Sequence, residues 1–525
     1  MKRGDLLLTF LGALMLALSR LPIHLGWLVF FAWIPYLVIF ERGIERPRHL
    51  LGMGFITSLV YILIVLNWIS LVTVPGLIGM IILYTFVYFA IFWSVHRIFR
   101  RLPLLRHLGF ITLLITFEYV QNYGQTRFPW FNLAYSLADY NILIQLADVA
   151  GITGLSVLII IVNLLLLNIL PISHKWRLSG RNSVSNKPHP LRAKRLACAA
   201  SLILIFAGWI AYGANVTRSI PLTKQDAGIF VMQPSIPQEI KWDRDQFDKS
   251  MATFRDLTLK AAADSARLVI WPEGAVTDYL AREPRSQGDI RAILDSAQVD
   301  IFTGFPDFKP APPEHVNDLV YFNAASLFQP NQFHHPVYYK NILVPVAERM
   351  LWLDELPFMW KLQFGQANWE FGTELEYYQS GGKTFSPSIC YELAFADIFH
   401  RMAIPRDSLT GVYNKCDYLV NLTNDAWFGT SYGPWLHAVM ARFRAVENRI
   451  QIFRSANTGI SLIVDPHGRV LDKTELFEIR NITAPLYQTP KIPLARKIHR
   501  YPLLLVALAL ALCAISWFKP IERLS

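Results

Sequence analysis

The chain has 525 residues, of which 53% are hydrophobic and only 17% are charged, so it is too apolar for one ordinary soluble domain. Its formal net charge of +11 needs no nucleic-acid partner, because many basic residues flank apolar segments, as topology signals in membrane proteins do. Composition therefore excludes a single soluble domain and gives no ground for nucleic-acid binding.

Uncharged apolar stretches fill the first part of the chain. The stretch from Leu50 to Val95 has no charged residue, and a helix that crosses a bilayer needs roughly 20 apolar residues. We predict a membrane domain over 1–216 with seven spans, a globular domain over 217–500 and a C-terminal span within 501–525, about eight spans in all. The predicted spans are 6–19, 25–40, two helices within 50–95 that divide near Pro75-Gly76, 108–123, 152–171, 196–216 and 502–518.

Basic residues in the short loops predict the orientation, because Lys and Arg near span ends stay on the cytoplasmic side. With the N-terminus inside, the cytoplasmic loops hold most of these residues, whereas the opposite short loops hold only Arg20 and Arg127. We therefore predict both termini inside and the large domain outside. A cleaved signal peptide over Met1–Ser19 is the alternative for the first span, although no small-x-small cleavage site follows it.

The cysteines do not form a disulfide framework. Two of the four cysteines, Cys198 and Cys513, lie in apolar spans. The remaining two are too few for a framework of disulfides. Cys390 and Cys416 could pair, but a free thiol at each position is the favoured interpretation.

Strands alternate with amphipathic helices in the globular domain, and this alternation indicates a layered α/β fold. Over 243–266, apolar residues such as Phe247, Met251 and Phe254 share one helical face. The predicted strands are 227–233, 267–271, 300–305, 319–327, 335–342, 383–389, 418–423, 451–455 and 460–464, and the predicted helices are 243–266, 283–297, 392–402 and 435–448.

Three of these strand-like segments end on side chains that could act together. Glu273 follows the first of them, Lys340 lies in the second, and Cys390 follows the apolar run that starts at Lys383. Any one of the three is more often a surface charge or a packed thiol than a functional group. Since strand ends converge on one rim of a layered α/β domain, the three together predict a catalytic set.

A thiol becomes a good nucleophile only when it loses its proton. Glu273 could take that proton, and Lys340 with a backbone N–H near Cys390 could stabilise the oxyanion that forms after attack on an ester carbonyl. Collapse would leave a thioester on Cys390, which an incoming amine would attack while Glu273 accepts the amine's proton. The set therefore predicts acyl transfer in two steps through one site.

Several short motifs surround these residues. They are Trp271-Pro272-Glu273, Tyr339-Lys340 with Leu343-Val344-Pro345 and Glu348, Ile389-Cys390-Tyr391-Glu392, Asn424-Asp425-Ala426-Trp427-Phe428-Gly429 followed by His437, and Phe128-Pro129-Trp130 with Ala134-Tyr135-Ser136. With these motifs the chain resembles the apolipoprotein N-acyltransferase family, a membrane branch of the nitrilase superfamily, over nearly its whole length. The last motif resembles a membrane-domain signature that a soluble nitrilase would lack.

The resemblance implies a membrane α-helical bundle joined to a periplasmic nitrilase-like α-β-β-α sandwich. It implies that an acyl chain moves from a phospholipid to Cys390, and then to the α-amine of the diacylglyceryl-modified N-terminal cysteine of an apolipoprotein. It also implies a multi-pass protein of the bacterial inner membrane with Glu273, Lys340 and Cys390 as catalytic residues. We expect a monomer without cofactor, metal or nucleic-acid partner.

The resemblance further implies a set of supporting residues that shape the pocket or face the substrate. Ordinary packing or structural hydrogen bonding is the competing interpretation for each of them. The set consists of Trp242, Glu348, Tyr391, Glu392, Asn424 and Trp427.

Glu118 lies within a predicted span, where an ionisable residue is costly and often functional. The family usually has an arginine three residues later, but this chain has Gln121. Two interpretations stay open, a protonated Glu118 or a pair with Arg127.

The stretch 350–371 is rich in aromatic residues, among them Trp352, Phe358 and Trp369. Tryptophans favour membrane interfaces, so we predict a mobile lid that contacts lipid. A buried subdomain is the alternative. The histidines His334, His335 and His437 show no metal-ligand spacing with cysteine.

Other functions fit parts of the pattern. A membrane-anchored amidase or hydrolase would use the same three residues with water as the second acceptor. A catalytically inactive protein that binds lipids or lipoproteins would keep the fold without turnover. A transporter is disfavoured, because the spans lack paired discontinuous segments.

Overall fold

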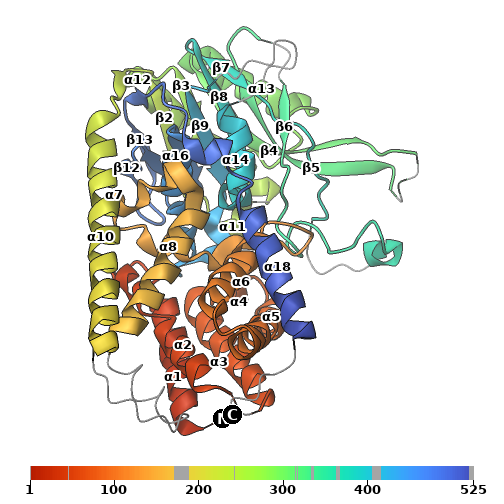
Figure 1. Ribbon diagram of the computed structural model, residues 1–525. Coiled ribbons are helices and arrows are strands. Elements are labelled where there is room, and N and C mark those ends of the chain that lie inside the picture. The colour runs from red at the N-terminus through yellow and green to blue at the C-terminus, as the bar shows by residue number, and fades with distance from the viewer. Residues whose placement is uncertain are drawn as a thin grey trace.

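The computed structural model has a helical part and a part built on two large sheets (Figure 1). It describes residues 2–44, 46–170, 189–241, 243–313, 315, 317–332, 336–361, 367–404 and 415–519. The start of α1 and the end of α18 lie toward the end of the molecule that is remote from the sheets (Figure 1).

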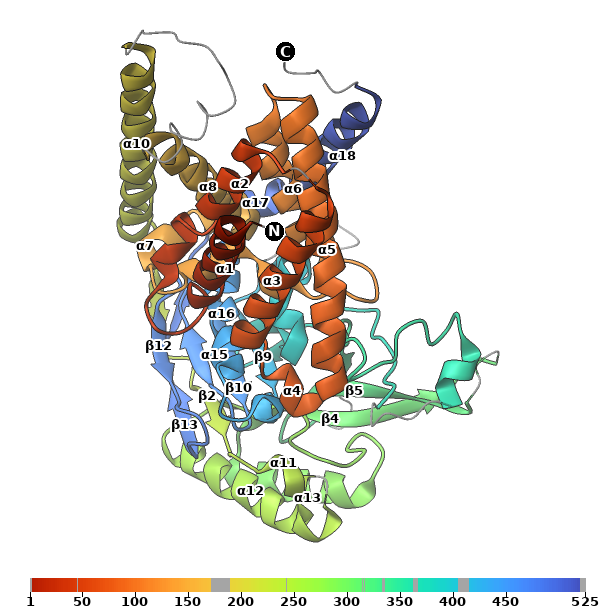
Figure 2. The ribbon, with the colours of Figure 1, turned by 90° about the horizontal axis from the view of Figure 1, so that it is seen from below.

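The helical part gathers on one side of the sheets, with α10 at its edge (Figure 2). The helices are α1 (Arg3–Leu18), α2 (Ile34–Arg42), α3 (Arg48–Val65), α4 (Ile69–Val72), α5 (Val74–Arg101), α6 (Arg106–Val120), α7 (Asn141–Ile144), α8 (Ala147–Ile169), α10 (His189–Ser219) and α18 (Pro502–Phe518), with 3-10 turns η1 (Gly26–Phe30), η2 (Pro129–Phe131) and η3 (Leu133–Leu137).

Within the described residues, four helices are long and apolar enough to cross a membrane, namely α3, α5, α8 and the 192–219 portion of α10, and α18 is a shorter apolar helix. The predicted boundary near Pro75 is confirmed, because α5 begins at Val74 and the Thr73 hydroxyl accepts a hydrogen bond from the Gly76 N–H. The predicted total of about eight spans stays a prediction.

The segment 25–40 is not the single helix that its apolarity predicts. It forms η1 and then α2, a helix of nine residues with Pro35 in its first turn. Proline has no N–H to donate, so it starts a helix more readily than it continues one. Nine helical residues reach about 14 Å, less than half the thickness of the hydrocarbon core.

Two six-stranded sheets form the second part. In the first sheet the order is β13-β2-β3-β4-β5-β6, and in the second it is β12-β11-β10-β9-β8-β7. Strands β2, β3 and β4 are parallel, as are β8, β9 and β10, and the outer strands of both sheets pair antiparallel. The strands are β2 (Ile229–Gln233), β3 (Leu268–Ile270), β4 (Asp300–Pro310), β5 (Leu319–Phe328), β6 (Val337–Tyr339), β7 (Tyr378–Ser380), β8 (Lys383–Ile389), β9 (Tyr418–Thr423), β10 (Gln451–Ala456), β11 (Leu462–Val464), β12 (Val470–Lys473) and β13 (Arg480–Thr483), with a separate pair β1 (Thr223–Gln225) and β14 (Leu486–Gln488).

Helices cover the outer faces of both sheets. On the first sheet, α12 (Phe247–Ala263) and α13 (Pro284–Ala297) bury apolar residues such as Phe254 and Ile293. On the second lie α14 (Ala396–Ala403) and α16 (Met440–Asn448), and α15 (Gly433–Ala438) packs against α16. The inner faces pack on each other through apolar side chains such as Phe302 and Phe385, whose ring centroids are 5.1 Å apart. This is the expected α-β-β-α order of layers.

A buried ion pair joins the helical part to the sandwich. The Asp148 carboxylate in the first turn of α8 lies 2.8 Å from Nη2 of Arg449, which follows α16, and both side chains are buried. Tyr212 of α10 donates a hydrogen bond to the same carboxylate, and the Lys491 ammonium lies 3.1 Å from it. Since the Asp148 carboxylate neutralises a buried guanidinium of the other part, this pair holds the two parts in one orientation.

Replacing Asp148 with leucine is expected to lower the free energy of unfolding by about 3–5 kcal/mol, because Arg449 then stays buried without its carboxylate. Thermal unfolding of the purified protein in detergent measures the loss as a lower midpoint. Asp472→Leu is the matched control, since the Asp472–Arg480 pair is partly exposed and should cost no more than about 1 kcal/mol. Equal midpoints for the two variants would contradict the expectation.

Candidate active site

The three predicted catalytic residues follow the carboxyl ends of strands. Glu273 is the third residue after β3, Lys340 directly follows β6, and Cys390 directly follows β8. The structure brings them together: Lys340 Nζ lies 3.5 Å from Glu273 Oε1, and both charges act on the Cys390 thiol. The packing of one sheet on the other thus joins residues that are far apart in sequence.

Lys340 is a buried cation held by two carboxylates. Its side chain is 0% exposed, and Nζ lies 2.8 Å from Glu348 Oε1 as well as 3.5 Å from Glu273. Burial alone would lower the pKa of Lys340, but Glu348 and Glu273 together outweigh burial and raise it. The ammonium therefore stays charged, as an oxyanion partner must.

Glu273 is oriented by two amide donors. Asn323 Nδ2 donates to Oε1 at 2.7 Å, and the backbone N–H of Asn424 donates to Oε2 at 2.8 Å. Asn323 also reaches Glu348 Oε1 at 3.3 Å, so one amide bridges the two carboxylates. Asn424, predicted as a supporting residue, thus contributes its backbone to the site, while its side chain donates to Gln238.

Cys390 stands in a left-handed backbone conformation with φ +48°, at the start of the 3-10 turn η6 (Cys390–Ala394). Residues other than glycine rarely adopt this region, and such strain is common at active sites. Burial raises the pKa of the Cys390 thiol, the negative charge of Glu273 raises it further, and Lys340 opposes both. The surroundings of the thiol therefore favour its protonated form.

Glu392 ties two strand ends together. Its carboxylate accepts hydrogen bonds from the Tyr338 hydroxyl and from the backbone N–H groups of Asn341, Ile342 and Ile389, at 2.6–3.1 Å. Burial raises the pKa of Glu392 to about 7, although the hydrogen bonds oppose the shift. These bonds hold the residues after β6 against the residues before Cys390, which places Lys340 beside the thiol.

Comparison with known proteins agrees with this arrangement. The model of the apolipoprotein N-acyltransferase N-terminal domain matches residues 12–165, and the carbon-nitrogen hydrolase model matches residues 231–488. An apolipoprotein N-acyltransferase of Geobacter metallireducens is 30% identical over 91% of this chain and 88% of its own length. The chain belongs to the apolipoprotein N-acyltransferase family.

A second apolipoprotein N-acyltransferase agrees with that membership. An apolipoprotein N-acyltransferase of Chlorobaculum tepidum is 26% identical over 91% of this chain and 88% of its own length. Among solved structures, an amidase from Nesterenkonia sp. covers 54% of this chain and 97% of its own, at 16% identity and a TM-score of 0.37.

In this apolipoprotein N-acyltransferase family member, a second buried lysine lies beside the predicted three residues. Lys241 Nζ donates to the backbone carbonyl of Glu273 at 2.9 Å, and its charge acts on both Glu273 and Cys390. Burial lowers the pKa of Lys241 to about 8. Sequence reasoning missed Lys241 and Asn323, and only the position of Lys241 directly before Trp242 was a signal. Trp242 itself lies outside the described residues.

His437 contacts the backbone of Cys390. Its Nε2 atom donates to the Cys390 carbonyl at 3.1 Å, while Nδ1 lies 3.0 Å from Asp425 Oδ1 and 3.1 Å from Arg454 Nη2. Burial and the Arg454 charge lower the pKa of His437, while Asp425 and the Cys390 carbonyl oppose this shift. The sequence motif contained Asp425 and His437 but did not indicate this contact.

The other supporting residues lie in different surroundings. Tyr391 is buried, and its hydroxyl donates to the Arg127 carbonyl at 2.6 Å. Trp427 is 54% exposed, on the turn η7 (Asp425–Phe428). All four cysteines are free, so Cys390 and Cys416 do not pair. Within the described residues, no group of three or more His, Cys, Asp or Glu side chains could hold a metal.

The aromatic segment after Met350 extends away from the sandwich, near the projecting ends of β4 and β5 (Figure 1). Trp352 and Phe358 are 49% and 59% exposed, whereas Leu353 is buried. Arg349 donates to the Trp369 carbonyl and pairs with Glu370, so polar contacts hold the end of this segment. The segment is therefore neither wholly buried nor free of the body of the protein.

Proposed function

We propose that this protein acylates the α-amine of the diacylglyceryl-modified N-terminal cysteine of apolipoproteins, with a phospholipid as donor and a thioester on Cys390 as intermediate. The observation that carries the proposal is the set of Glu273, Lys340 and the thiol of Cys390, in a chain that belongs to the apolipoprotein N-acyltransferase family. All three residues come from one chain, so a monomer is sufficient.

In the first half of the reaction, the Cys390 sulfur attacks the ester carbonyl carbon of the phospholipid while its proton moves to Glu273. Lys340 and a backbone N–H near Cys390 stabilise the oxyanion. Collapse breaks the ester C–O bond, and Glu273 returns its proton to the departing alcohol of the lysophospholipid. Because the thiol rests protonated, proton transfer and attack belong to one step.

In the second half, the free amine of the lipoprotein attacks the thioester carbonyl and loses a proton to Glu273. An amide forms as the C–S bond breaks, and the sulfur recovers a proton. Lys241 balances the charge of this buried site, since Glu273 and Glu348 face the two ammonium groups of Lys340 and Lys241.

Both substrates are lipids, and the architecture suits this. The sandwich follows α10 and precedes α18, so it is tethered at both ends to apolar helices. Tethering raises the effective concentration of a site near the bilayer, where acyl esters are concentrated. We place the sandwich on the periplasmic side of the bacterial inner membrane, because most basic residues near the span ends lie in the loops predicted to be cytoplasmic.

The exposed aromatic residues after Met350 support a lid. Trp352, Leu356 and Phe358 are 40–59% exposed, and an exposed apolar group of this kind suits contact with lipid. Gln125, in the loop after α6, donates to the Glu355 carboxylate and accepts from the Trp352 N–H, so this lid rests on the helical part.

The test is a two-stage acylation. The purified protein in detergent receives phospholipid alone, and mass spectrometry of the peptide that contains Cys390 should show one added acyl group. A diacylated lipopeptide with a free α-amine should then discharge the adduct into an amide. Release of free fatty acid without the amine would favour a hydrolase, and no adduct would favour a binding protein; either result overturns the proposal.

His437→Ala is expected to slow adduct formation by about 10- to 100-fold, because a nucleophile misplaced by about 1 Å loses activity of that order. His437→Gln should recover part of the rate, since its side-chain amide can donate to the Cys390 carbonyl. The rate of acylation with phospholipid alone measures the effect. His400→Gln is the control, because His400 is also buried but bonds to Asn448. Equal rates for His437→Ala and wild type would exclude the positioning role.

A further inference from the structure

A buried arginine lies beside the buried glutamate of the helical part. Arg20, two residues beyond α1, is 3% exposed, and Glu118 of α6 is 5% exposed. The Arg20 charge acts on the Glu118 carboxylate. Arg127, the partner that the sequence suggested, instead lies with its guanidinium carbon 6.0 Å from the ring centre of Phe395. Glu118 therefore has Arg20 as its nearby cation.

The two side chains hold the two ends of one turn. Arg20 Nη2 donates to the Trp130 carbonyl at 3.4 Å, and Tyr61 donates to the same oxygen at 3.4 Å. Glu118 Oε1 accepts from the Leu133 N–H at 2.9 Å. Since Trp130 belongs to η2 and Leu133 begins η3, the pair fixes the backbone that connects these turns.

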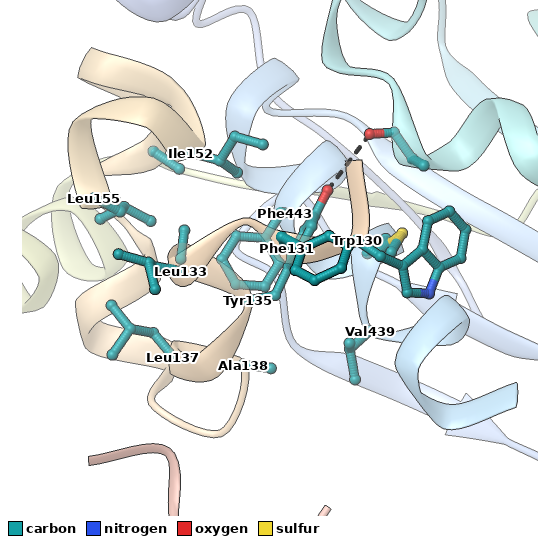
Figure 3. Close-up of a cluster of buried hydrophobic side chains, with 14 of the residues drawn as sticks. Trp130, Phe131, Leu133, Tyr135, Leu137, Ala138, Ile152, Leu155, Val439 and Phe443 are labelled. Atoms are coloured by element: carbon teal, nitrogen blue, oxygen red, sulfur yellow. Dashed lines mark hydrogen bonds between the residues drawn. The ribbon is translucent and has the colours of Figure 1, made fainter. Parts of the chain in front are cut away.

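That turn packs against the catalytic half. Figure 3 shows Trp130 and Tyr135 beside Val439 and Phe443, which lie in and just before α16. The Tyr135 and Phe443 rings meet edge to face with centroids 5.1 Å apart. A movement of the turn would therefore be transmitted to the sandwich.

One contact of the turn reaches Tyr391, the residue after Cys390. The Trp130 ring stacks on the Tyr391 ring with centroids 5.4 Å apart and planes 14° apart. Tyr391 follows Cys390 directly in the 3-10 turn η6, and Cys390 itself has the left-handed backbone conformation. Trp130 also lies 5.9 Å, ring to ring, from His437, which donates to the Cys390 carbonyl.

Polar atoms of the pair face a small internal cavity. Arg20, Glu118 and Ser136 contribute to its wall, and its volume is about 20 Å³, enough for about one water molecule. Arg20 Nε and Nη1 and Glu118 Oε2 have no hydrogen-bond partner among the residues that the structure describes. Buried charges of this kind are costly unless they are paired, so a role in packing alone does not explain why both are there.

We infer that Arg20 and Glu118 are positioning residues for Cys390: they fix the 130–133 turn, and the Trp130–Tyr391 stack transmits that position to the nucleophile. The inference rests on the proposed function, because it assigns these residues a role in the acylation of Cys390. It also links the helical part of the chain to the rate of the first chemical half-reaction.

The first test compares single-turnover acylation of Cys390 by phospholipid in Glu118→Gln and wild type. The variant should lose about 10- to 100-fold in the acylation rate constant, as expected for a misplaced nucleophile, with less than about twofold change in half-saturating phospholipid. Arg20→Lys, which keeps the charge, should lose less than Arg20→Gln. Glu41→Gln is the matched control, because Glu41 pairs with Arg106 elsewhere in the helical part.

The second test is a double-mutant cycle on the same rate constant. If the pair acts through Trp130, Glu118→Gln should add little to the loss caused by Trp130→Ala, whereas independent effects would add. Additive losses, or a wild-type rate in Glu118→Gln, would overturn the inference. If Glu118→Gln does not fold, as judged by its thermal midpoint, the cycle is run with Arg20→Lys. Absence of an adduct in wild type would instead refute the proposed function.

Discussion

Cys390→Ala is expected to abolish both the acyl adduct and the transfer of an acyl chain to the lipopeptide. In the proposed reaction the sulfur carries the acyl chain, so its removal should reduce turnover by at least about 10⁴-fold. Mass spectrometry of the protein incubated with phospholipid checks the adduct, and amide formation checks the transfer.

Cys416→Ala is the matched control for this result. Cys416 is also a buried thiol, but it donates to the Met402 carbonyl. It lies just before the amino end of β9, whereas the site forms at the carboxyl ends of the strands. The control should keep nearly full activity. Equal loss in the two variants would refute the choice of nucleophile.

Glu273→Gln should reduce the rate of acylation by about 10²- to 10⁴-fold, the range that a general base contributes. The substitution keeps the shape and a hydrogen-bonding oxygen for Asn323 but cannot take the proton of Cys390. Because burial raises the pKa of that thiol, little thiolate forms without the base. Single-turnover acylation measures the loss, and Glu283→Gln, at the residue directly before the outer helix α13, is the control.

The residual rate of Glu273→Gln should depend on pH in a way that identifies the missing base. Below the pKa of a thiol, the thiolate fraction rises about tenfold per pH unit, so the residual rate should rise with that slope. Measurements well below pH 8 are the most direct, because burial lowers the pKa of Lys241 to about 8 and the substitution removes the Glu273 charge that opposes this shift. A residual rate independent of pH would indicate that Glu273 is not the base.

Much of the sandwich could be predicted because its central strands are continuous apolar runs that end in distinctive polar residues. The runs before Glu273 and Cys390 are of this kind, and both form the expected strands. The strands β7, β11, β13 and β14 have only three or four residues. Such segments show no clear two-residue period, and only β11 was predicted, within 460–464.

The polar partners of the site were harder to predict, because their proximity depends on how the chain crosses itself. Asn323 and Lys241 are isolated polar residues in sequence, yet both donate hydrogen bonds to Glu273. Arg20 was a loop charge in the topology argument, and only the fold places it beside Glu118. The sequence left open a pair between Glu118 and Arg127, nine residues apart along the chain, but the Arg127 guanidinium lies against the ring of Phe395 instead.

The packing of the α16 layer on the helical part means that the catalytic half is not a module that can be excised. Val439 and Phe443 are 7% and 0% exposed because Tyr135 and its neighbours cover them. A fragment trimmed to the sandwich would expose this apolar surface to solvent, together with the Arg449 guanidinium, which would lack its Asp148 partner. Such a fragment should aggregate during expression, and a water-soluble version would require polar replacements on the surface that includes Val439 and Phe443.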